Sequence, residues 1–112
     1  MKTTASGHNA EEAAANYLTS QGFSVLAKNW RTKTCEIDIV AKKDNVIYFC
    51  EVKYRGSDFQ GDGFEYITPA KLKQVTYAAQ TWVNEQDWDG DYRLLAAAVS
   101  GDAYQDVEIT EI

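Results

Sequence analysis

The chain has 112 residues, of which 45% are hydrophobic and 25% charged, and its formal net charge is −6. These values exclude a disordered or low-complexity class, and no apolar run approaches the length that crosses a bilayer. The length predicts a single domain over residues 1–112. The acidic balance argues against non-specific binding to nucleic-acid phosphates. Because the start of the sequence has no apolar leader, we expect a cytoplasmic protein with no membrane association.

The first predicted element is a helix over residues 9–21. Asn9 is a typical N-cap residue, and Gly22 is typical of the position just after a helix end. Apolar side chains recur at helical spacing at Ala10, Ala14, Tyr17 and Leu18.

Glu11 falls on the apolar stripe of this helix, in line with Ala14, Ala15 and Leu18. Burying a carboxylate costs free energy unless it is paired or bound to a metal. Two interpretations follow. Glu11 either contributes to a metal site or interacts, from the first turn, with the helix dipole.

Three strands are predicted next, over residues 23–27, 35–41 and 46–54. The second and third are rich in β-branched and aromatic residues. They are joined by a short polar loop over residues 42–45, so the sequence predicts a β-hairpin.

A second helix is predicted to begin at Thr68-Pro69, after a glycine-rich loop over residues 55–66. Threonine is expected as the N-cap and proline in the first turn. Lys71 also lies in that turn, where the neutral interpretation is a side chain that packs its apolar stem and exposes its ammonium. The apolar stripe of this helix comprises Leu72, Val75, Ala79, Trp82 and Val83.

Two further strands are predicted over residues 92–99 and 106–112. The order helix, three strands, helix, two strands predicts an α/β or α+β domain with a mixed sheet.

Acidic residues gather on one side of the predicted hairpin. A four-residue loop would place Glu36 opposite Glu51. Because strand side chains alternate between faces, one face is expected to carry Glu36, Asp38, Glu51 and Lys53. The other is expected to be the core face, with Ile37, Ile39, Tyr48, Cys50 and Val52.

Like charges on neighbouring strands repel one another unless they are neutralised. In one interpretation, the patch is an ordinary solvated surface on which Lys53 and other cations offset this repulsion. In the other, the patch holds a divalent cation such as Mg²⁺, which prefers carboxylate oxygens, water and substrate phosphate.

Charge is unevenly distributed along the chain. Residues 28–55 contain seven basic and four acidic residues, whereas residues 56–112 contain three basic and eleven acidic residues. The first stretch is either a solvated surface or a local basic face around a few carboxylates, and charge alone leaves both interpretations open.

A motif spans the hairpin. Cys35-Glu36-Ile37-Asp38-Ile39-Val40 is followed by Phe49-Cys50-Glu51-Val52-Lys53-Tyr54-Arg55. This set resembles the core motif of the PD-(D/E)XK nuclease superfamily. More narrowly, the chain resembles the small bacterial YraN-like proteins, which are related in fold to archaeal Holliday-junction resolvases. Further matches are Ala10-Glu11, Asn29-Trp30-Arg31 and Ile67-Thr68 with Lys71.

Three positions depart from the family pattern. Ala10 and Cys35 stand where the family has glycine, and Arg93-Leu94-Leu95 stands where the family tends to carry an aspartate. The central motif does not depend on that aspartate.

The resemblance implies a restriction-endonuclease-like αβββαβ core, with a mixed central sheet flanked by helices. It implies Mg²⁺ or Mn²⁺ as cofactor, with Asp38 and Glu51 as the main metal ligands. The backbone carbonyl of Val52 would join them, and Glu11 would complete the site directly or through water.

The resemblance also assigns the remaining site residues. Lys53 would orient the attacking water and stabilise charge on the scissile phosphate. Glu36 is a secondary candidate for a second metal or a water. Arg55 and Lys71 would contact phosphate.

The function implied is that of a metal-dependent endonuclease that hydrolyses DNA phosphodiester bonds at branched or damaged DNA, in repair or recombination. The alternative is a structure-specific nucleic-acid-binding or partner-binding module with little or no turnover, and a third interpretation is a protein adaptor without a metal. A resolvase-like fold, which must cut two strands, is also compatible with a homodimer.

Overall fold

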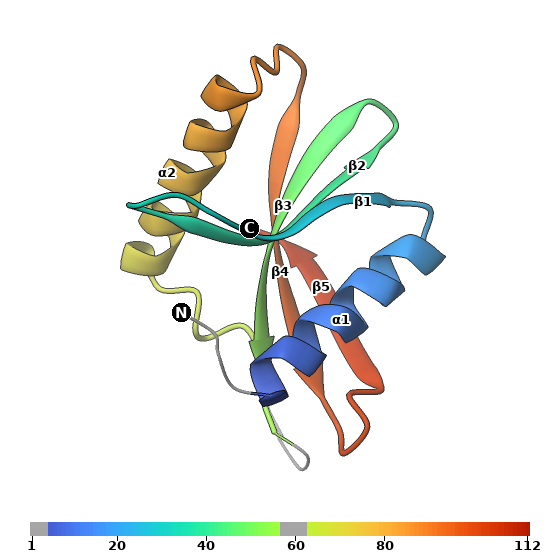
Figure 1. Cartoon of the computed structure of the whole chain (residues 1–112). Helices are drawn as coiled ribbons and strands as arrows, with labels where there is room; N and C mark the ends of the chain where they lie inside the picture. Colours follow the sequence, from blue (N-terminus) through green and yellow to red (C-terminus); the bar gives the residue numbers. More distant parts are fainter. Residues whose placement is uncertain (1–4, 57–62) are drawn as a thin grey trace.

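The computed structural model describes residues 5–56 and 63–112 (Figure 1). The elements follow in the predicted order: α1 (Ala5–Ser20), β1 (Ser24–Arg31), β2 (Glu36–Lys43), β3 (Val46–Tyr54), α2 (Pro69–Glu85), β4 (Tyr92–Ser100) and β5 (Asp106–Glu111). This order and the mixed sheet confirm the predicted α/β class, in a restriction-endonuclease-like arrangement.

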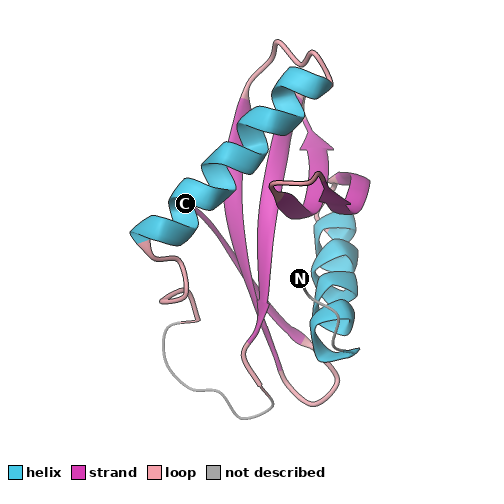
Figure 2. Cartoon of the chain, turned by 60° about the vertical axis from the view of Figure 1, so that its left-hand side comes forward, coloured by secondary structure: helices cyan, strands magenta, loops and turns pink. Residues whose placement is uncertain are grey.

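The five strands form one sheet in the order β1-β2-β3-β4-β5. Neighbouring strands are antiparallel except β3 and β4, which are parallel. The connection between parallel strands must return to the same end of the sheet, and α2 provides it. The two helices cover opposite faces of the sheet (Figure 2).

The ends of both helices follow from local sequence. Gly22 has a φ of +94°, and the Phe23 N–H donates to the Leu18 carbonyl at 3.0 Å, so α1 ends as predicted in a glycine-dependent turn. The predicted start of α2 is also confirmed, because the Thr68 hydroxyl accepts the Lys71 N–H at 3.1 Å. The N-cap prediction at Asn9 is wrong: α1 already begins at Ala5.

The β2–β3 hairpin turns more tightly than predicted. Lys43 pairs with Val46, so the loop has two residues, Asp44 and Asn45, rather than four. Both adopt positive φ, +51° and +66°, which Asp and Asn tolerate better than most residues and which suits a two-residue hairpin turn. The register moves by two positions, and a shift of two residues does not by itself turn any side chain to the other face.

This register changes which acidic residues meet. Ile39 pairs with Cys50. If this register is continued by one pair, Asp38 stands opposite Glu51. The predicted four-residue loop would instead place Glu36 opposite Glu51.

Both faces of the hairpin are buried, whereas the sequence predicts one core face. Under α1, Leu18 and several alanines pack on Ile39, Cys50 and Val52. Under α2, the core includes Val40, Ile47, Phe49, Ala78, Ala79 and Trp82.

Two side chains lie elsewhere than predicted. Ile37 packs with the Trp82 cluster, because the ends of β1 and β2 twist away from the sheet toward α2 (Figure 1). At these residues β2 pairs with β1 but not with β3. A two-stranded ribbon twists more strongly than a wider sheet. Leu72, predicted in the apolar stripe of α2, is exposed, because the start of α2 stands off from the sheet. Within the described ranges, no helix is long and apolar enough to cross a membrane.

Candidate active site

A cavity of about 960 Å³ lies between the β1–β2 ribbon and the first turns of α2. Its inner wall is acidic and its rim carries basic side chains. The charged residues among those that line it are Arg31, Glu36, Asp38, Glu51, Lys71 and Lys73.

Asp38 is buried at the inner end of this cavity, with 3% of its surface exposed. Its Oδ2 accepts a hydrogen bond of 2.8 Å from the Val52 N–H. This backbone hydrogen bond fixes the position of the Asp38 carboxyl group at the cavity wall. The two backbone groups of a strand residue point to the same side, and the Val52 carbonyl therefore also faces β2.

Glu51 lies beside Asp38 and is tied to α2. Its Oε2 is 3.2 Å from the Lys71 ammonium, and its side chain is only 13% exposed. The N-cap of α2 places Lys71 in the first helical turn, pointing back toward the sheet. Asp38, Glu51 and Lys71 therefore bring two carboxylates and one ammonium to this cavity from three different elements.

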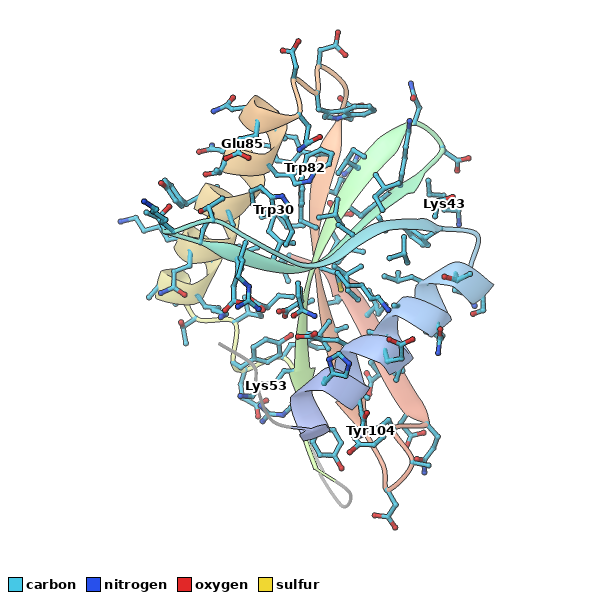
Figure 3. The ribbon with its side chains drawn as sticks, in the orientation of Figure 1. Trp30, Lys43, Lys53, Trp82, Glu85 and Tyr104 are labelled. Atoms are coloured by element: carbon cyan, nitrogen blue, oxygen red, sulfur yellow. The ribbon has the colours of Figure 1, made fainter. Side chains whose placement is uncertain are left out.

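Glu36, the secondary candidate, also lines the cavity. Among the residues that the structure describes, the cavity lining includes neither Lys53 nor Arg55. Lys53 is exposed toward the far end of β3 (Figure 3). Arg55 forms an ion pair of 2.6 Å with Glu65, and its guanidinium lies 6.0 Å from the centre of the Tyr66 ring.

Glu11 lies on α1, across the sheet from α2, and is 2% exposed. Its predicted place on the buried stripe of that helix is confirmed. It is not one of the residues that line the cavity described above. Within residues 5–56 and 63–112, no group of three or more His, Cys, Asp or Glu side chains is arranged to hold a metal ion.

The residues present nevertheless suit a hard cation with few protein ligands. Mg²⁺ is usually held by one or two carboxylates, with water and substrate phosphate in its remaining positions. Asp38 and Glu51 supply two carboxylates at the wall of one open cavity. The donor set therefore fits Mg²⁺ or Mn²⁺ in this mode and does not form a cage of protein ligands.

Tyr66 is a site residue that the sequence did not predict. Its hydroxyl lies 3.2 Å from the carbonyls of both Glu51 and Ala97, so it fastens α2's entry loop to β3 and β4. Burial first, and then the neighbouring Cys50, Glu51 and Asp38, raise the pKa of Tyr66 far above its usual value. The sequence carries no signal for this role, because Tyr66 lies in a loop without helical or strand periodicity.

The fold and this cavity define a small restriction-endonuclease-like α/β protein with paired carboxylates beside a basic rim. The chain belongs to the uncharacterised protein family UPF0102, whose model matches residues 10–101. This membership confirms the narrower, YraN-like part of the resemblance drawn from the sequence.

Relatives in this family come from distant bacteria. A UPF0102 protein of Sulfurihydrogenibium sp. strain YO3AOP1 is 41% identical over 102 residues, covering 90% of this chain and 89% of its own. One from Vibrio parahaemolyticus is 38% identical over 95 residues, covering 83% and 78%. One from Cytophaga hutchinsonii is 31% identical over 102 residues, covering 91% and 90%.

Proposed function

We propose that the protein is a metal-dependent endonuclease of the PD-(D/E)XK superfamily, which hydrolyses DNA phosphodiester bonds at branched or damaged sites. The observation that carries this proposal is the meeting of Asp38 and Glu51 at one cavity wall, with the Lys71 ammonium 3.2 Å from Glu51. Like charges on neighbouring strands repel one another unless a cation lies nearby.

Asp38 and Glu51 would hold Mg²⁺ or Mn²⁺, together with the Val52 carbonyl. Bound there, the ion would polarise the scissile phosphate and lower the pKa of a bound water. The Val52 N–H fixes the Asp38 carboxylate before the ion arrives, which reduces the reorganisation that binding requires.

Two lysines are proposed to act on the phosphate from opposite sides of Glu51. Lys71 already contacts the Glu51 carboxylate and would exchange this contact for one with a phosphate oxygen. Lys53 follows Glu51 by two residues on the same face of β3, about 6.6 Å further along the strand. It would orient the attacking water. Glu36, at the cavity rim, would contact a second ion or a water.

Two residues have weaker structural support. Glu11 would act through water or support the site from the α1 side, because it does not line the cavity. Arg55 would have to leave its ion pair with Glu65 to bind phosphate.

The proposal is tested by Mn²⁺-dependent cleavage of a labelled four-way junction and of plain duplex DNA. We expect Asp38→Asn and Glu51→Gln to lower the cleavage rate at least about 100-fold, since each removes a charged ligand but keeps its shape. Lys53→Met should have a comparable effect, and Glu11→Gln a smaller one.

Glu108→Gln is the matched control, because Glu108 is an exposed carboxylate on β5. It should cleave at the wild-type rate. Thermal melting of each variant shows whether the fold persists. Undiminished cleavage by folded Asp38→Asn and Glu51→Gln variants would contradict the proposal.

One observation favours a second function, that of a nucleic-acid-binding module with little turnover. The Lys71–Glu51 ion pair already neutralises one of the carboxylates that line the cavity. Binding of the junction in Ca²⁺, without cleavage in Mg²⁺ or Mn²⁺, would select this alternative.

A further inference from the structure

The cavity has two walls that meet at their outer end. One wall is the β1–β2 ribbon and the other is the first half of α2. The hydroxyls of Thr34, on the ribbon, and Tyr77, on α2, share a hydrogen bond of 3.3 Å. The cavity is therefore spanned by a side-chain bridge on the side away from Asp38 and Glu51.

The walls carry the two chemical groups that bind an unpaired nucleic-acid strand. Arg31, Lys71 and Lys73 line the cavity and offer positive charge for phosphates. Tyr77 lines it too, with 52% of its surface exposed, and offers an aromatic face. Positive grooves with aromatic side chains bind single strands, because each base can stack on a ring while cations follow the backbone.

The spacing of these groups fits a strand. Lys71 and Tyr77 are six residues apart in α2, which is about 9 Å along the helix axis. Successive nucleotides in a stacked strand are about 3.4 Å apart, so this span corresponds to two or three nucleotides. A phosphate at Lys71 would therefore place a base two or three positions away beside Tyr77.

The size of the cavity does not suit intact duplex. Its volume of about 960 Å³ corresponds to about 10 Å in each direction, and a duplex is wider than its major groove, which alone measures about 12 Å. An intact duplex would therefore rest outside the cavity, whereas a single strand can enter it.

We infer that this cavity takes an unpaired DNA strand, with a base stacked on Tyr77 and phosphates on Lys71, Lys73 and Arg31. The inference rests on the proposed nuclease function, because it names the part of the substrate that enters the same site. It explains how a chain of net charge −6 binds DNA: a short basic rim contacts a few phosphates of one strand, and the acidic remainder stays away from the duplex.

The test is fluorescence anisotropy in Ca²⁺ with a labelled thymidine oligonucleotide of about ten nucleotides and a labelled duplex of equal length. We expect tighter binding of the single strand. Tyr77→Ala should weaken that binding about fivefold or more, because it removes the stacking surface. Tyr77→Phe keeps the ring, loses the bond to Thr34, and should bind within about twofold of wild type.

Tyr17→Ala is the matched control, since Tyr17 is a comparably exposed tyrosine, at 39%, on α1. Its binding should be unchanged. Equal affinity for strand and duplex, or wild-type binding by Tyr77→Ala, would overturn the inference.

A cleavage assay distinguishes failure of this inference from failure of the proposed nuclease function. If the inference alone is wrong, Mn²⁺-dependent cleavage persists in Tyr77→Ala and is lost in Asp38→Asn. If the nuclease proposal alone is wrong, single-strand binding depends on Tyr77 but no DNA is cut.

Discussion

The two faces of the sheet are covered in different ways. On one face, α1 lies close to the strands, and its buried apolar side chains are Leu18 and several alanines. On the other, the buried side chains of α2 are Val75, Ala78, Ala79 and Trp82, which start at the middle of the helix. The first turns of α2 carry no buried side chain, and the cavity with Asp38 and Glu51 lies beneath them.

Side-chain size and polarity explain the difference. Alanines let a helix approach a sheet closely, and the resulting interface is packed as densely as any protein interior. The first turns of α2 instead carry Lys71, Lys73 and Gln74, whose polar ends must stay hydrated. One face therefore serves stability, while the opposite face combines stability at one end with an open site at the other.

The largest effect that can test this division is a deletion under α1. Leu18 is 1% exposed, and Leu18→Ala should lower the free energy of unfolding by about 2–5 kcal/mol through lost packing and a cavity. Lys73→Ala, at the cavity rim, should change it by no more than about 0.5 kcal/mol. Urea unfolding measures both. Similar losses of unfolding free energy in the two variants would show that the α1 face does not contribute more to stability than the cavity rim.

An intermediate effect is expected at Tyr66, which joins α2's entry loop to the sheet. Tyr66→Phe removes the hydroxyl near the Glu51 and Ala97 carbonyls and should cost about 1 kcal/mol of unfolding free energy. Its raised pKa adds a pH signature. The folded-state pKa lies above the usual 10.0, so this stabilisation is complete below pH 10 and is lost as the pH rises above it.

Unfolding measured on both sides of pH 10 checks this expectation. Wild-type stability should fall more steeply above pH 10 than that of Tyr66→Phe. Parallel curves for the two proteins would mean that the hydroxyl has no such role.

The smallest effect concerns the outer surface of α1. Glu12 pairs with Lys28 at 2.8 Å, and this hydrogen bond, with the charge of Lys28, lowers the pKa of Glu12 below 4.5. The stabilisation is present above pH 4.5 and is lost as the pH falls through the lowered pKa. Because both side chains are exposed, Glu12→Gln should cost at most about 0.5 kcal/mol at neutral pH.

Chemical denaturation at neutral pH and at pH 3 measures this difference. The variant should be slightly less stable at neutral pH, and the gap should close in acid. A loss above about 1 kcal/mol would show that this side of α1 is not a simple solvated surface.

Local sequence predicted most of the elements because their signals are local. The Thr68-Pro69 start of α2, the Gly22 end of α1 and the full extent of β3 each follow from a few neighbouring residues. The hairpin loop was predicted two residues too long, since Lys42 and Lys43 look like loop residues while they continue the strand. The residue pattern did not predict that a second helix buries the other face of the hairpin, because this depends on tertiary packing.

The site shows the same limit. Alternation along β2 and β3 is enough to place Asp38 and Glu51 on one face, and the cavity contains both. Tyr66 lies in a loop without periodicity, and only the folded chain brings its hydroxyl to β3 and β4. Helical spacing predicted that Glu11 is buried, but not that it lies apart from the cavity, because that depends on how α1 is docked.

The most direct measurement is an anomalous difference map from a crystal soaked in Mn²⁺. We expect one peak in the cavity, within bonding distance of the Asp38 and Glu51 carboxylates, and its loss in Glu51→Gln. A map without a peak there, from a soak in which the cavity is open to solvent, would contradict the assignment of these two carboxylates as a metal site.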